Sequence, residues 1–212
     1  MLRPRLRWPS RRTLGITVAV VVAAAVLGGG AWWWSRTQAR RADAAYASAL
    51  AHVQETVGPQ AALAARAAAI RDLEGVLAQY PSARLAGPAA YELANMRYAA
   101  RDWARARAAY EVALARAESP TVRALARLGI GYTWEAERNY PKALDTYQSG
   151  LAALKPGDFQ YEELLLDLGR VQELAGRKAD AIATYRRALR ELPQGLRTAD
   201  ARSRLATLGA GP

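Results

Sequence analysis

The chain has 212 residues, of which 51% are hydrophobic and 8% are aromatic, and its formal net charge at pH 7 is +11. It contains no cysteine, which excludes disulfides, thiolate metal sites, cysteine nucleophiles and the lipid-bearing N-terminal cysteine of a bacterial lipoprotein. Alanine, the best helix former, supplies much of the apolar fraction, and β-branched residues are sparse outside one N-terminal run, so we predict an all-α chain.

The positive charge is concentrated at the N-terminus. Residues 1–41 contain eight arginines and no acidic residue, and removing those eight charges from the net +11 leaves +3 for residues 42–212. Basic residues beside a membrane span set its topology or contact anionic lipid. No motif combines aromatic and basic residues as nucleic-acid-binding proteins do, so we predict no nucleic-acid partner.

Residues 13–35 form an uncharged run, TLGITVAVVVAAAVLGGGAWWWS, which is long enough to cross a bilayer as a helix. Three tryptophans, Trp32 to Trp34, close the run, and indole rings favour the headgroup level. Five arginines precede the run and three follow it. The positive-inside bias therefore predicts a cytoplasmic head (residues 1–12), a single bacterial inner-membrane anchor (Thr13–Ser35) and a periplasmic remainder, with the opposite orientation as the alternative.

Two export signals compete with this anchor. A cleaved signal peptide needs a small-residue cleavage site, and three tryptophans are a poor context for one. Ser10-Arg11-Arg12 resembles the start of a twin-arginine signal, but the residues that follow match that pattern only loosely. We therefore predict that the span stays uncleaved.

Residues 36–81 indicate a leading helix and a degenerate helical pair. The apolar residues recur at helical spacing: Ala39, Ala42, Tyr46, Ala49, Leu50, Val53 and Val57. Gly58-Pro59 interrupts that helix, and a second helix is expected from about Gln60 to Gln79.

Residues 82–212 contain three copies of one motif, in segments 91–114, 128–151 and 165–189. Each copy has a small residue, then an alanine twelve positions later, a tyrosine four after that and a leucine a further four on. These residues are Ala94, Ala106, Tyr110 and Leu114; Gly131, Ala143, Tyr147 and Leu151; and Gly169, Ala181, Tyr185 and Leu189. We call Tyr110, Tyr147 and Tyr185 the repeat tyrosines.

The motif is that of the tetratricopeptide repeat (TPR), a pair of antiparallel helices whose usual period is 34 residues. The small residues are expected to let the first helix of each pair lie close against the second, and the tyrosines to fill the space between successive pairs. Turns are expected at Arg101-Asp102, Arg138-Asn139 and Gly176-Arg177, extra residues in Ala115–Pro120 and Leu154–Gln160, and a capping helix near Thr198–Leu208. The resulting fold is an N-terminal transmembrane helix followed by a TPR-type α-solenoid.

Nothing in the chain indicates catalysis. His52 is the only histidine, so no histidine cluster exists to hold a metal, and Glu162-Glu163 fit the acidic first turn of a helix. We predict no catalytic, cofactor-binding or metal-binding residue.

Partner binding is the better interpretation of the solenoid. In TPR folds the first helix of each pair lines the concave face, and aromatic, apolar and a few charged side chains there form a peptide groove. The predicted partner-binding residues are Tyr91, Asn95, Tyr98, Leu125, Leu128, Tyr132, Glu135, Leu166, Arg170 and Glu173, and the alternative for each is packing between pairs. Of the carboxylate-clamp positions that bind chaperone tails, only Asn95 matches.

The arrangement resembles the periplasmic TPR proteins of the YfgM-like group, ancillary subunits of the Sec translocon. The residues that carry this resemblance are the basic head, the single span, the helical lead Arg36–Val57 and the phrase LAQYPSARLAGPAAYELA at 77–94. The resemblance implies contact with the Sec translocon and periplasmic chaperones. A scaffold for envelope assembly, cell division or cell-wall complexes is the alternative, although such relatives are usually exported free of the membrane. A subunit whose partner carries the chemistry is a third.

Overall fold

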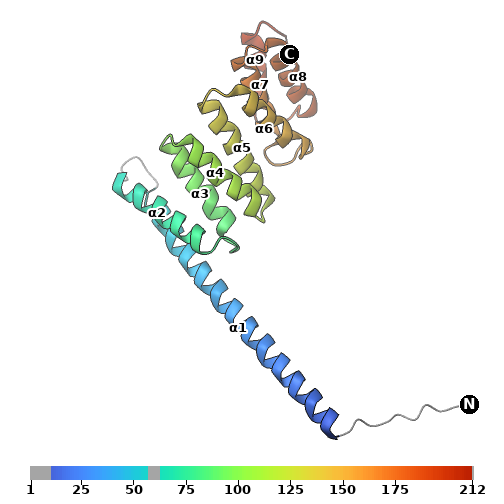
Figure 1. Ribbon diagram of the computed structural model, residues 1–212. Coiled ribbons are helices and arrows are strands. Elements are labelled where there is room, and N and C mark those ends of the chain that lie inside the picture. The colour runs from blue at the N-terminus through green and yellow to red at the C-terminus, as the bar shows by residue number, and fades with distance from the viewer. Residues whose placement is uncertain (1–10, 57–62, 212) are drawn as a thin grey trace, which may run out of the picture. The chain divides into compact units, whose positions relative to one another are not determined.

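The computed structural model describes residues 11–56 and 63–211, with side chains from residue 20 onward except that of Glu55 (Figure 1). These residues form nine α-helices and no strand: α1 (Arg11–Glu55), α2 (Leu63–Gln79), α3 (Ala86–Ala99), α4 (Trp103–Arg116), α5 (Pro120–Ala136), α6 (Tyr140–Ala152), α7 (Tyr161–Leu174), α8 (Lys178–Glu191) and α9 (Thr198–Thr207). The predicted all-α class is confirmed for this part of the chain. Residues 1–44 and 45–212 are separate compact units.

The N-terminal unit is the first part of α1. Its tryptophans Trp32, Trp33 and Trp34 are 59%, 66% and 63% exposed. Among the residues that the structure describes, no helix is both long and apolar enough to cross a bilayer. The predicted cytoplasmic head, residues 1–12, and the first seven residues of the predicted span, 13–19, lie outside the described side chains.

The second unit begins with the end of α1 and α2. Tyr46, Ala49 and Val53 of α1 are buried in one core with Leu73 of α2 and the alanines of α3. The helix predicted from about Gln60 to Gln79 corresponds to α2, and both end at Gln79. The predicted break at Gly58-Pro59 and residues 60–62 lie outside the described part of the chain.

Three helical hairpins follow, α3–α4, α5–α6 and α7–α8, and they coincide with the three predicted repeats (Figure 1). Each helix from α3 to α8 packs against the next in the chain, and α3 also contacts α5. The connection at 117–119 falls within the predicted segment Ala115–Pro120, and that at 153–160 begins one residue before the predicted Leu154–Gln160. Helix α9 packs on α8 as the predicted capping helix. The TPR-type solenoid is therefore confirmed.

The tight turn inside each hairpin uses the same backbone conformation in all three repeats. Arg101, Arg138 and Gly176 each stand nine residues before a repeat tyrosine, with φ of 60°, 57° and 74°. Glycine adopts this left-handed region freely, whereas a residue with a Cβ adopts it at a cost of about 1 kcal/mol or more. The predicted turn positions are confirmed, with arginine in the glycine position of the first two.

The small residues of the motif leave room for the repeat tyrosines. A Cβ on Gly131 would lie 2.1 Å from Cε1 of Tyr147, and a Cβ on Gly169 would lie 2.5 Å from Cε1 of Tyr185. Both tyrosines are almost fully buried, at 0% and 1% exposure. Each glycine therefore admits the ring of its own hairpin, which corrects the expectation that the tyrosines fill the space between successive pairs; Tyr110, which lies against Gly129 of the next hairpin, also fits that expectation.

Candidate protein-binding surface

The first helices of the three hairpins, α3, α5 and α7, carry the predicted binding residues at equivalent positions. Fifteen residues before the repeat tyrosine stand Asn95, Tyr132 and Arg170, and twelve residues before it stand Tyr98, Glu135 and Glu173. Because the repeats share one backbone geometry, these positions form two rows along one side of the solenoid. We call this side the first-helix face.

Each repeat tyrosine connects its own hairpin to this face. The hydroxyl of Tyr147 donates to Glu135 Oε1 at 2.5 Å, and that of Tyr185 donates to Glu173 Oε1 at 2.5 Å. The hydroxyl of Tyr110 donates to Asn95 Oδ1 at 2.8 Å. The buried rings thus hold the polar side chains of the first helices in fixed positions.

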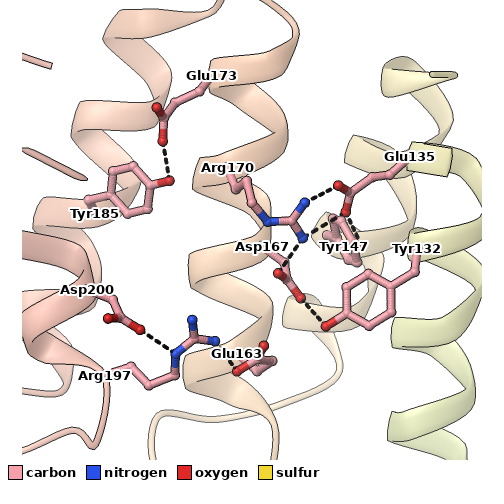
Figure 2. A network of polar contacts seen from close by, with 10 residues as sticks. All are labelled: Tyr132, Glu135, Tyr147, Glu163, Asp167, Arg170, Glu173, Tyr185, Arg197 and Asp200. Atoms are coloured by element: carbon pink, nitrogen blue, oxygen red, sulfur yellow. Dashed lines mark hydrogen bonds and ion pairs between the residues drawn. The ribbon is translucent and has the colours of Figure 1, made fainter. Parts of the chain in front are cut away.

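A polar network joins α5 to α7 across a repeat boundary (Figure 2). The hydroxyl of Tyr132 donates to Asp167 Oδ2 at 2.7 Å, and Arg170 Nη2 donates to Asp167 Oδ1 at 2.6 Å. The same guanidinium binds both oxygens of Glu135, with Nη2 lying 3.0 Å from Oε1. A guanidinium that binds carboxylates through several N–H groups fixes their orientation as well as their charge.

Burial and hydrogen bonding shift the pKa values of this network. Burial raises the pKa of Asp167, which is 5% exposed, even though the hydrogen bonds from Arg170 and Tyr132 act in the opposite direction. Burial lowers the pKa of the Arg170 guanidinium, but its bonds to Glu135 and Asp167 outweigh that effect and raise it overall. The pKa of Tyr147 is raised by burial and then by Glu135.

A second set of polar contacts, around Arg197, lies toward the C-terminus (Figure 2). The Arg197 guanidinium lies 2.5 Å from Glu163 Oε2 and 2.7 Å from Asp200 Oδ2, which ties α7 to α9. The neighbouring Glu162 accepts the backbone N–H groups of Leu196 and Arg197 at 3.0 and 2.8 Å. The two glutamates predicted as first-turn charges therefore also bind the loop before the capping helix.

Comparison with protein-family models decides the family. The model described as a tetratricopeptide repeat-like domain matches residues 8–209. The chain belongs to this family. The match begins before the uncharged run, so it extends over more than the repeats.

Solved structures agree with the family at the level of fold, with 53 matching chains. One of them, the crystal structure of MamA protein, has a TM-score of 0.52 and 21% sequence identity over 61% of this chain. The alignment spans 65% of the MamA chain, just under two thirds of its length. This likeness shows the fold alone. No curated protein matches the sequence.

The TPR-like fold brings most of the predicted binding residues together on the first-helix face. Tyr132, Glu135, Arg170 and Glu173 belong to the polar contacts of Figure 2. Burial raises the pKa of Tyr98, Glu135 raises it further, and Arg170 acts in the opposite direction. Its ring packs against Trp103 with centroids 4.8 Å apart.

Of the remaining predicted residues, two are half-buried and two belong to the core. The Tyr91 ring packs against Tyr110 with centroids 5.9 Å apart, and Leu125 is half-buried. Leu128 and Leu166 are only 3% and 6% exposed and belong to core clusters. For these two leucines the structure shows the packing alternative.

Six residues with polar contacts in Figure 2 were absent from the predicted binding set: the repeat tyrosines Tyr147 and Tyr185, and Glu163, Asp167, Arg197 and Asp200. Asp167 stands at the repeat position of Glu92 and Gly129, where no common side chain draws attention to it. Arg197 and Asp200 lie beyond the last repeat and reach α7 only through the capping helix. No group of three or more histidine, cysteine or acidic side chains suited to a metal ion occurs among the described residues.

Proposed function

We propose that this TPR-like chain is a membrane-anchored scaffold that binds protein segments along its first-helix face. The observation that carries the proposal is the network of Tyr132, Glu135, Asp167 and Arg170, which presents ordered polar groups from two adjacent repeats. TPR solenoids use such extended surfaces for protein recognition. Preorganised side chains lower the entropy lost when a partner binds.

The anchor in this proposal is Thr13–Ser35, with the solenoid in the periplasm. Its support is the uncharged run, the exposed tryptophans at its end and the excess of arginines before it. The family match, which starts at residue 8, includes the whole run.

The proposed partners follow from the resemblance to the YfgM-like group: the Sec translocon and periplasmic chaperones. Affinity purification of the full chain from gently solubilised membranes tests this. Recovery of the Sec channel together with periplasmic chaperones supports the proposal. Recovery of wall-synthesis or division proteins alone contradicts it in favour of an envelope-assembly scaffold.

The binding surface itself is tested in the same experiment with two variants. Tyr98→Ser removes an aromatic side chain from the first-helix face, and we expect it to reduce partner recovery. Val112→Ser on α4, where Val112 is 42% exposed and lies outside that face, is the control and should leave recovery unchanged. Equal recovery with both variants, at unchanged helicity, would place the binding surface elsewhere.

A further inference from the structure

Carboxylates outnumber guanidiniums among the polar contacts on and beside the first-helix face, although the chain is basic. The contacts of Figure 2 include five carboxylates, those of Glu135, Glu163, Asp167, Glu173 and Asp200, but only two guanidiniums, those of Arg170 and Arg197. Arg204 adds a third cation beside the narrow cavity that Arg170 and Arg197 line. The acidic groups therefore exceed the basic ones on a chain of net charge +11.

The ion pairs among these contacts leave negative charge unbalanced. Glu135 and Asp167 share the single guanidinium of Arg170, and Glu163 shares Arg197 with Asp200. Within the described residues, Glu173 has one hydrogen-bond partner, the hydroxyl of Tyr185, and no ion pair. Its charge is thus the least compensated of the set.

An aromatic side chain stands in the same row as these carboxylates. Tyr98 occupies the repeat position of Glu135 and Glu173, and it is half-buried. Its hydroxyl makes no hydrogen bond to any described residue. Aromatic rings attract cations through their faces, and a row of one aromatic ring followed by two carboxylates complements lysine or arginine side chains.

We propose that the first-helix face binds an extended protein segment that carries lysine or arginine side chains. One cation pairs with Glu173, and others lie along the row toward Glu135 and Tyr98. The proposal rests on the proposed scaffold function and names the class of segment that the scaffold takes. The competing explanation is that the carboxylates serve only as acceptors for the buried tyrosines.

Glu173→Gln separates these two explanations. The glutamine side chain keeps a carbonyl oxygen that accepts the Tyr185 hydroxyl, so the acceptor role is preserved while the charge is removed. Glu111→Gln on α4 removes the same charge from an exposed position off the face and serves as the matched control.

The experiment uses the full chain in detergent micelles and measures binding by fluorescence anisotropy. The probes are two labelled peptides, one in which lysine alternates with serine and one in which every lysine is replaced by glutamine. We expect the lysine peptide to bind more tightly, with an affinity that falls as salt rises. Glu173→Gln should weaken it about fivefold, as one partly exposed charge contact worth roughly 1 kcal/mol implies, and Glu111→Gln should leave it within about twofold.

Several results would overturn the inference: equal binding of both peptides, no binding of either, or equal loss in the two glutamine variants. If the glutamine peptide binds as well as the lysine peptide and Tyr98→Ser abolishes both, the face is a peptide site without charge preference, and only the inference fails. If Tyr98→Ser changes neither peptide binding nor partner recovery from membranes, the proposed function fails as well.

Discussion

Gly131→Ala tests the packing that defines the repeats. The added methyl would lie 2.1 Å from Cε1 of Tyr147, whereas ordinary carbon contacts begin near 3.4 Å, so the ring must move by more than 1 Å. The ring has little freedom to do so, because it is fully buried and its hydroxyl is bound to Glu135 at 2.5 Å. Overpacking of this kind costs about 1–3 kcal/mol, and the better helix propensity of alanine returns about 1 kcal/mol.

The net expectation is a loss of about 0–2 kcal/mol in the free energy of unfolding, where Gly75→Ala shows a gain. Gly75→Ala is the matched control, because Gly75 is also helical, is exposed and has no atom within 4 Å of an added Cβ. It should gain about 0.5–1 kcal/mol through helix propensity alone. Urea unfolding of the full chain in micelles, followed by circular dichroism at 222 nm, measures both.

A double-mutant cycle identifies the atom responsible. When Tyr147→Ala has removed the ring, Gly131→Ala should become neutral or stabilising, as at Gly75. If Gly131→Ala raised the unfolding midpoint as much as Gly75→Ala does in the otherwise unchanged chain, the glycine–tyrosine contact would not determine the register of the repeat.

Three further predictions concern the turn, the tyrosines and the network. Arg138→Gly should raise the free energy of unfolding by about 1 kcal/mol, because glycine adopts the left-handed backbone conformation of Arg138 without strain. Arg177→Gly is the control and should bring no such gain, since φ of Arg177 is −87°. Equal effects of the two variants in urea melts would exclude backbone strain as the cause. Burial raises the pKa values of the repeat tyrosines, so above the ordinary tyrosine pKa of about 10 the folded state holds more protons than the unfolded state. The free energy of unfolding should therefore fall by about 1.4 kcal/mol per pH unit for each tyrosine. Absorbance at 295 nm should show the tyrosines ionising only as helicity is lost, and ionisation within the folded state would contradict their burial. Arg170→Gln leaves Glu135 and Asp167 without their shared cation and should lower the free energy of unfolding by about 2–3 kcal/mol. This loss is smaller than that for a fully buried ion pair, because the Arg170 side chain is 32% exposed. An unchanged melting midpoint would show that the network contributes nothing to stability.

The helical hairpins were predictable because their determinants are local. Gly131 and Gly169 precede their tyrosines by a constant interval, and that interval indicates which helices pair. The turn positions were equally visible, although arginine at 101 and 138 gave no sign of a left-handed backbone. Local spacing thus predicts the repeat, while the backbone strain depends on the tight connection between the two helices.

The binding face was predictable only in part, because its contacts join distant residues. Arg170 reaches Glu135 across 35 positions, and the acidic Asp167 enters the network through Tyr132 in the preceding repeat. Sequence spacing placed Leu128 and Leu166 on the face, but the sides of α5 and α7 that carry them pack into the core. The direction of a helix side depends on both neighbouring hairpins, which spacing within one repeat does not describe.

Site-specific photo-crosslinking tests the central claim most directly. A photoreactive amino acid at position 98 on the first-helix face is compared with one at position 112 on α4, each in the full chain within intact membranes. The account predicts that illumination captures partner proteins from position 98 and not from position 112. Capture from position 112 alone would show that partners bind outside the face formed by α3, α5 and α7.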